Sequence, residues 1–167
     1  MPKRIPTIIG ISAATSGAGK TTLIEKLIPD LLQKNINVSV VKHAHHNFDI
    51  DFPGKDSYRL RKSGAFQTLI FNNKRSALIT EFTEESESLQ KMIGQMDHDV
   101  DLIIVEGLRG SEFKKIEVFR SSHSMKKLFL HDENVIAIVS DEQLNASVPC
   151  LNLNKIDEIS NFIISNL

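Results

Sequence analysis

The sequence predicts an α/β fold in three layers, with a mostly parallel sheet between layers of helices. Along most of the chain, short apolar segments of strand length alternate with segments that carry a helical spacing of apolar residues. One of these strands, Leu102 to Val105, is apolar at every position, which is typical of a central parallel strand. Strands that alternate with helices favour parallel pairing, and therefore favour this layered architecture.

The N-terminal part of the chain begins with a strand and an amphipathic helix. The strand is the apolar segment Ile8 to Ile11, and the helix extends from about Lys20 to Lys34, with leucines recurring every four positions. Asn35 tolerates the left-handed conformation that commonly ends a helix. The alternating segment Ile36 to Lys42 then predicts a second strand.

A β-hairpin insertion and a second set of strands follow. Asp56 or Ser57 can cap a short helix that ends at Gly64, and Thr83 can cap a later helix with an acidic first turn. The hairpin pairs Thr68–Phe71 with Ala77–Thr80 across a short polar loop. Beyond Leu102–Val105, we expect strands at 116–119, 135–139 and 149–153, and a closing helix that buries Ile156, Ile159 and Ile163.

The segment between the first strand and the first helix has the pattern of a phosphate-binding P-loop, with Ala14 in place of the first consensus glycine. The glycines let backbone N–H groups point at phosphate oxygens, and the helix N-terminus adds its dipole. Lys20 would place a cation on the terminal phosphates, and Thr21 would give its hydroxyl to Mg²⁺. The expected nucleotide-binding residues here are Ser16, Gly17, Ala18, Gly19, Lys20, Thr21 and Thr22.

A second element expected at the nucleotide is the end of the strand Leu102–Val105. Glu106 follows this strand directly and would lie near Mg²⁺, in the manner of a Walker B acid. Gly107 would bring its backbone N–H to the γ-phosphate. Together with the P-loop, this pair predicts a fold of the P-loop NTPase type.

The polar loop after the second strand, residues 43–57, is expected at the same edge of the sheet and has the character of a mobile switch. Asp49 and Asp51 are candidate ligands of Mg²⁺ or of its water. His43, His45 and His46 could instead bind a transition metal. In a third interpretation the loop is solvated and binds no ligand.

Two aspartates are candidates for reading a guanine base. Asp141 follows the strand at 135–139, where a carboxylate could accept the base N1–H and N2–H. The literal pattern Asn154-Lys155-Ile156-Asp157 is the other candidate, but Asp157 is also explained as a first-turn acid of the closing helix. We favour Asp141.

Composition limits the class of protein. The 167 residues fit a single domain, 1–167, and a net charge of −1 argues against a general nucleic-acid binder. Because Cys150 is the only cysteine, no intramolecular disulfide is available, which together with a nucleotide site indicates the cytoplasm. No apolar run approaches the ~18 residues of a membrane span, so we expect no membrane association.

Beyond the P-loop, the chain resembles the molybdopterin-guanine dinucleotide biosynthesis protein B family. The resemblance rests on segments that match in order and spacing nearly from end to end: Ser16–Leu23, Val41–His46, Asp49–Asp51, Pro53–Tyr58, Ser63–Ala65 and Leu102–Gly107. The pair of motifs K-H-x-H-H and P-G-K-D-S is much more specific than the P-loop.

This resemblance implies a GTP-binding adapter with GTP and Mg²⁺ as cofactors. It also implies a homodimer, partnership with the guanylyltransferase that attaches GMP to molybdopterin, and molybdopterin itself as a ligand to consider. We expect weak intrinsic GTPase activity at most, because no glutamine or arginine is clearly placed for hydrolysis. Two alternatives are a metal-delivery GTPase of the nickel-insertion type, using the His-rich loop 43–51, and a small-molecule kinase, which ranks last.

Overall fold

The computed structural model describes the chain except for residues 1–4, 45–46, 83–87, 97–98, 108 and 124–125. Its contacts divide the chain into two compact units. The sheet unit consists of Met1–His43 and Asp97–Leu167, and the hairpin unit consists of Ala44–Met96. The single nucleotide-binding domain over residues 1–167 stays a prediction. None of the helices formed by the described residues is long and apolar enough to cross a membrane.

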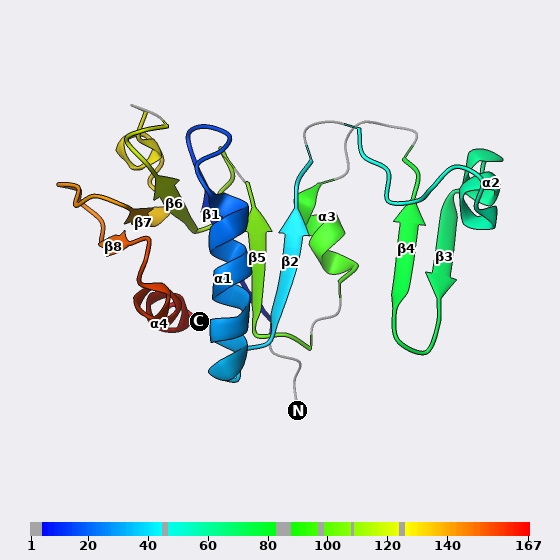
Figure 1. The fold of residues 1–167 in the computed structure, drawn as a ribbon, viewed down its shortest axis with the longest axis horizontal. Coiled ribbons are helices and arrows are strands. Elements are labelled where there is room, and N and C mark those ends of the chain that lie inside the picture. The colour runs from blue at the N-terminus through cyan, green and yellow to red at the C-terminus, as the bar shows by residue number, and fades with distance from the viewer. Residues whose placement is uncertain (1–4, 45–46, 83–87, 97–98, 108, 124–125) are drawn as a thin grey trace. The chain divides into compact units, whose positions relative to one another are not determined.

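The sheet unit contains six strands in the order β2-β5-β1-β6-β7-β8, and every neighbouring pair is parallel (Figure 1). The strands are β1 Thr7–Ser12, β2 Val38–Lys42, β5 Leu102–Glu106, β6 Lys115–Phe119, β7 Val135–Ser140 and β8 Cys150–Asn152. The predicted α/β class with a mostly parallel sheet is therefore confirmed. Because β1 is central, with β5 on one side and β6 on the other, three strand ends meet around the loop that follows β1.

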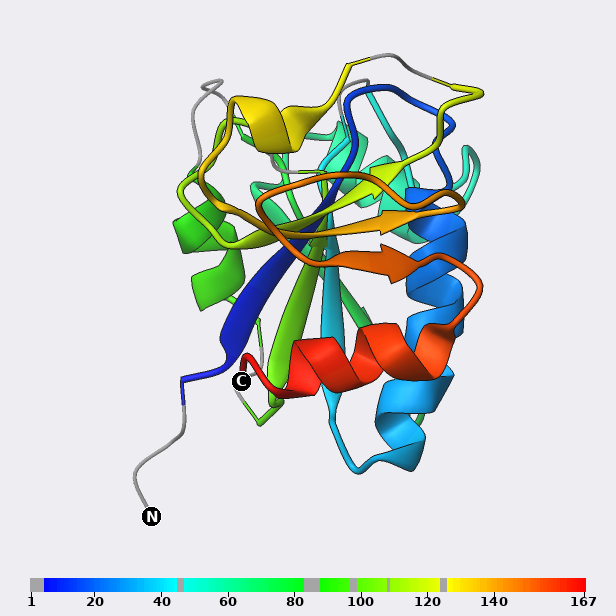
Figure 2. The same cartoon turned by 90° about the vertical axis from the view of Figure 1, so that its left-hand side faces the viewer.

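Two helices cover one face of this sheet. Helix α1 spans Lys20–Gln33 and helix α4 spans Ile156–Ile164 (Figure 2). The predicted leucine stripe of α1 is buried and belongs to one apolar cluster with alternate residues of the strands and with Ile159 and Ile163 of α4. The core therefore lies between the sheet and these two helices.

Helix α1 ends as the sequence predicts. Asn35 has a φ of 60°, in the left-handed region. Its N–H donates to the Leu32 carbonyl at 3.0 Å, and the N–H of Ile36 donates to the Leu31 carbonyl at 3.0 Å. These two bonds form a Schellman motif, which satisfies carbonyls that the end of a helix leaves unpaired.

The opposite face of β6 carries two buried ionisable side chains that the sequence pattern did not reveal. Lys115 is fully buried, and its ammonium donates to the Ser111 carbonyl and to the Asp132 carboxylate, both at 2.7 Å. Glu117 is also fully buried and accepts the N–H groups of Leu128 and Phe129 at 2.7 and 2.9 Å. These bonds hold the 3₁₀ turn η1, Leu128–Leu130, on this face of the sheet.

Burial affects the acids of this face differently. Burial raises the pKa of the Glu117 carboxyl, and the two backbone N–H groups oppose that rise only in part. At Asp132, burial also acts to raise the pKa, but the hydrogen bond from Lys115 and that from the Asn134 N–H outweigh it and lower the pKa. Asp132 is therefore held as a carboxylate by its partners.

The hairpin unit contains the predicted antiparallel pair. The hairpin unit's elements are α2 Asp56–Lys62, β3 Gln67–Phe71, β4 Ser76–Thr80 and α3 Leu89–Gly94, with Gln67 opposite Thr80. The Asn72 side-chain oxygen accepts the N–H groups of Lys74 and Arg75, which closes the hairpin loop. The predicted cap Thr83 lies outside the described residues, and Ser88 caps α3 by accepting the Lys91 N–H.

We predict that Lys115→Met lowers the free energy of unfolding by about 3 kcal/mol, because it leaves the partly buried Asp132 carboxylate without its counter-charge. Urea denaturation at neutral pH measures the change. Lys114→Met is the matched control, since Lys114 is the exposed neighbour, and its effect should stay within ~0.5 kcal/mol. Equal stabilities of the two variants would contradict a structural role for the buried pair.

Candidate functional site

The candidate site is the loop between β1 and α1 at the carboxyl edge of the parallel sheet, drawn in blue at the top of β1 in Figure 2. Gly17 and Gly19 have φ values of 79° and 97°, in the region that glycine adopts most readily. Gly19 is the N-cap of α1, and no side chain caps this helix. The loop therefore ends at a helix N-terminus whose dipole and N–H groups favour an anion.

The predicted nucleotide-binding residues lie consecutively along this loop and the first turn of α1. Lys20 is the first residue of the helix, and within the described chain no hydrogen bond or ion pair engages its ammonium. Ser16 and Thr22 are exposed, whereas Ala18 is buried. The ligand contacts of these residues stay predictions.

A hydroxyl and a carboxylate meet beside this loop. The Thr21 hydroxyl donates to the Glu106 carboxylate at 2.9 Å, and the Lys42 ammonium lies 3.8 Å from the other Glu106 oxygen. Glu106 ends β5, the strand next to β1, as the sequence predicts. A hydroxyl and a carboxylate are oxygen ligands of the kind that Mg²⁺ prefers. The residues present therefore fit a magnesium ion held at the P-loop.

The contact predicted between the Gly107 N–H and a γ-phosphate stays a prediction. In this structure the Gly107 N–H donates to the Ile11 carbonyl at 2.9 Å, which extends the ladder between β5 and β1. Gly107 does have a φ of 115°, and a Cβ added there would lie 4.0 Å from the His43 Cβ. The glycine is thus explained by its backbone conformation.

The predicted metal ligands Asp49 and Asp51 belong to the hairpin unit. Arg61 is buried and donates to both Asp49 carboxylate oxygens, at 2.6 and 2.8 Å, and to Glu81 at 2.6 Å. The hydrogen bond from Arg61 lowers the pKa of Asp49. Asp51 accepts the Ser57 hydroxyl at 3.1 Å. Both carboxylates therefore have partners inside their own unit, and their role toward Mg²⁺ stays a prediction.

The predicted transition-metal alternative falls largely outside the described residues, because His45 and His46 are not described. Among the residues that are described, no group of three or more histidine, cysteine, aspartate or glutamate side chains is arranged to hold a metal ion.

The two candidate base readers lie in very different places. The Lys34 ammonium donates to the Asp157 carboxylate at 2.7 Å. Lys34 follows the last residue of α1, whereas Lys20 is the first. The 14 residues of α1 span about 20 Å at ~1.5 Å per residue, so Asp157 lies at the end of the helix away from the P-loop. Asp141 is exposed directly after β7, at the carboxyl edge of the sheet. This geometry agrees with the preference for Asp141, which stays a prediction.

Arg120 and His123 also lie at the P-loop, and sequence reasoning missed both. They are the first and last residues of a turn after β6, in which the His123 N–H donates to the Arg120 carbonyl at 3.0 Å. A Cβ added at Gly19 would lie 3.5 Å from a terminal nitrogen of Arg120, and one added at Gly17 would lie 3.8 Å from the His123 ring. Figure 2 shows the P-loop and the segment after β6 side by side. Only the pairing of β6 with β1 brings these residues here.

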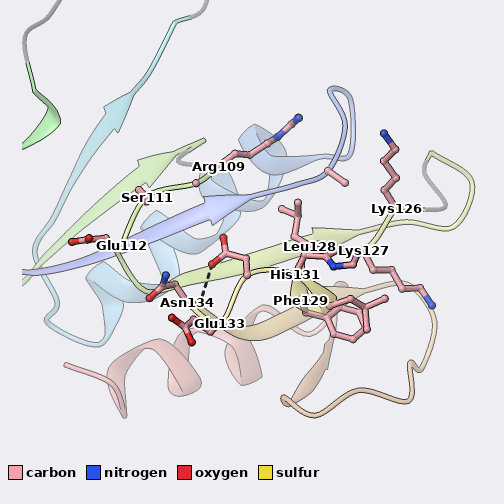
Figure 3. Close-up of a pocket in the computed structure, with 14 residues that line it drawn as sticks. Arg109, Ser111, Glu112, Lys126, Lys127, Leu128, Phe129, His131, Glu133 and Asn134 are labelled. Atoms are coloured by element: carbon pink, nitrogen blue, oxygen red, sulfur yellow. Dashed lines mark hydrogen bonds between the residues drawn. The ribbon is translucent and has the colours of Figure 1, made fainter.

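A separate pocket of about 1220 Å³ opens near the P-loop, which contributes only Ala14 to it (Figure 3). Its other lining residues come from the segments before and after β6, and they include Asp132, the ion-pair partner of Lys115. The side chains of Arg109, Lys126 and Lys127 extend from its rim in different directions instead of converging. The positive side chains of this pocket are therefore spread out, whereas at the P-loop Lys20 lies at the N-terminus of a helix.

Known proteins resemble this chain in sequence. The model of the family described as "Molybdopterin guanine dinucleotide synthesis protein B" (MobB) matches residues 8–141. The molybdopterin-guanine dinucleotide biosynthesis adapter protein of Escherichia coli is 45% identical over 156 residues, which cover 91% of this chain and 89% of that protein. The adapter protein of Haemophilus influenzae is 40% identical over 164 residues, which cover 98% of this chain and 90% of that protein.

The fold is also shared with solved structures. A crystal structure of molybdopterin-guanine biosynthesis protein B superposes with a TM-score of 0.75 at 27% identity, covering 96% of this chain and 99% of that one. A MobB homologue from Bacillus stearothermophilus superposes with a TM-score of 0.71 at 20% identity, covering 95% of this chain and 96% of that one. The family match and the two close relatives lead to one conclusion: this chain belongs to the molybdopterin-guanine dinucleotide synthesis protein B family.

Proposed function

We propose that this protein is a GTP-binding adapter in the biosynthesis of molybdopterin guanine dinucleotide. The pathway follows from the family and from the names of its Escherichia coli and Haemophilus influenzae relatives. One observation in this chain supports a nucleotide: the P-loop, beside which Thr21 and Glu106 are hydrogen-bonded. An adapter that holds GTP assists the guanylyltransferase, which consumes GTP when it attaches GMP to molybdopterin.

The residues of the sheet unit suit the binding of GTP and Mg²⁺. The backbone N–H groups from Ser16 to Gly19 would surround the phosphates, and the Lys20 ammonium would lie against the terminal ones. Thr21 would coordinate the metal directly, and Glu106 would hold one of its waters. A bound Mg²⁺ would neutralise charge on the β- and γ-phosphates. Asp141 is our candidate for pairing with the guanine base.

The remaining parts of the proposal come from the family resemblance and composition. We propose a homodimer that works in the cytoplasm and has slow intrinsic GTPase activity at most. The single cysteine agrees with a reducing compartment.

We predict that Lys20→Ala weakens GTP binding about 10- to 100-fold, because it removes hydrogen bonds between a cation and phosphate oxygens. The fold should persist, since no described residue depends on this ammonium. Isothermal titration with a GTP analogue and Mg²⁺ measures the affinity. Lys26→Ala, an exposed lysine of the same helix, is the control. A folded Lys20→Ala protein with wild-type affinity would refute the P-loop assignment.

The base-reading prediction compares two aspartates. Asp141→Asn should reduce the preference for GTP over ATP by about 10- to 100-fold, because a carboxylate pairs with two guanine donors and an amide cannot. Asp157→Asn should leave this preference unchanged, since Asp157 is paired with Lys34 at the far end of α1. Competition binding with the two nucleotides measures both variants. The opposite pattern would move the base site to Asn154–Asp157.

The adapter role is tested by adding the protein to purified guanylyltransferase with molybdopterin, GTP and Mg²⁺. We expect the wild-type protein to increase the rate of molybdopterin guanine dinucleotide formation at limiting GTP, and Lys20→Ala to give little increase. Lys26→Ala should stimulate like the wild type. Equal stimulation by wild type and Lys20→Ala would show that the adapter acts without its nucleotide.

A further inference from the structure

We propose that Arg120 is a phosphate-binding residue of the nucleotide site, contacting the same phosphate chain as Lys20. This inference rests on the proposed function, because it requires a nucleotide at the P-loop. It adds a cation supplied by β6 to the groups supplied by β1, α1 and β5.

The first support is the direction of the Arg120 side chain. Arg120 directly follows β6, and the turn closed by the His123 N–H fixes its backbone. Three of its guanidinium atoms lie 3.5 to 3.9 Å from the position that a Cβ on Gly19 would occupy. The guanidinium therefore packs against the N-cap residue of α1, where the first N–H groups of the helix are exposed to a ligand.

The second support is electrostatic. The N-terminus of α1 carries a partial positive charge, Lys20 adds a full charge, and Arg120 adds another beside them. Within the described residues, no carboxylate forms an ion pair with Arg120. Arg61 of the hairpin unit shows the usual arrangement for a largely buried arginine, with two carboxylates on its guanidinium. Positive groups gathered without a counter-ion repel one another, and a bound polyphosphate would relieve that repulsion.

The third support is a pair of buried polar atoms without partners. The Arg120 Nε and the Thr15 hydroxyl of the P-loop are both buried, and neither forms a hydrogen bond within the described protein. Buried donors are normally paired, since an unpaired one loses its hydration without compensation. Phosphate oxygens at the P-loop would accept from both.

The chemistry of the residue sharpens the proposal. A guanidinium is planar and donates in parallel to two oxygens of one phosphate, whereas an ammonium acts as a point charge. Arg120→Lys should therefore keep part of the GTP affinity that Arg120 contributes. Arg120→Gln should lose most of it.

Two measurements on the same variants test the proposal. The first is GTP affinity with Mg²⁺ by calorimetric titration, for wild type, Arg120→Gln, Arg120→Lys and the control Arg75→Gln, whose arginine is exposed in the loop between β3 and β4. The second is the urea midpoint of each nucleotide-free protein. We expect Arg120→Gln to bind GTP about 10- to 100-fold more weakly, Arg120→Lys to fall between it and wild type, and Arg75→Gln to bind normally.

The stability measurement separates binding from a structural role. If Arg120 serves a phosphate, Arg120→Gln removes a positive charge from beside the positive N-terminus of α1, and the nucleotide-free midpoint stays equal or rises. A midpoint that falls, together with weaker binding, would assign Arg120 to the packing of the P-loop and overturn the proposal. Wild-type affinity in Arg120→Gln would overturn it as well, while leaving GTP binding itself intact. Absence of GTP binding by the wild-type protein would remove the proposed function and this inference together.

Discussion

The hydrogen bond between the Thr21 hydroxyl and the Glu106 carboxylate joins residues that are 85 positions apart, and the site depends on the arrangement that permits it. The two residues meet because β1 and β5 are parallel neighbours whose carboxyl ends lie at the same edge. β6 pairs with β1 on its other side and brings Arg120 to the P-loop by the same rule. A central parallel strand with two parallel neighbours thus assembles the site from three distant segments, and no one of these segments could form it alone.

The parts of the fold that the sequence predicted well are those set by local chemistry. The P-loop follows from glycines that need positive φ beside a helix start, and Asn35 ends α1 because its side chain tolerates the left-handed region. The buried strand Leu102–Glu106 was evident from continuous apolar sequence. The helix boundaries at Lys20 and near Lys34 were also local, since they depend on residues within a turn of each end.

The parts that could not be predicted depend on partners far along the chain. The hydrogen bond from the Gly107 N–H to the Ile11 carbonyl was not expected, because it depends on the register of β5 against β1, which no local pattern reveals. Arg120 looked like an ordinary residue after a strand, since its importance arises only from the pairing of β6 with β1. The literal pattern ending in Asp157 looked like a base-reading motif, yet its carboxylate is engaged by Lys34.

The buried Lys115 and Glu117 of β6 have a consequence for which parts of the chain are stable together. Each needs a partner from the segment just after the strand, 17 positions away for Lys115 and 11 for Glu117. A strand with unpaired charges on one face gains little by joining the sheet. Removing water from those charges costs more free energy than the burial of its apolar residues provides. The burial of β6 and the ordering of the segment through Asp132 are therefore energetically coupled, so that each is stable against the sheet only when the other is in place.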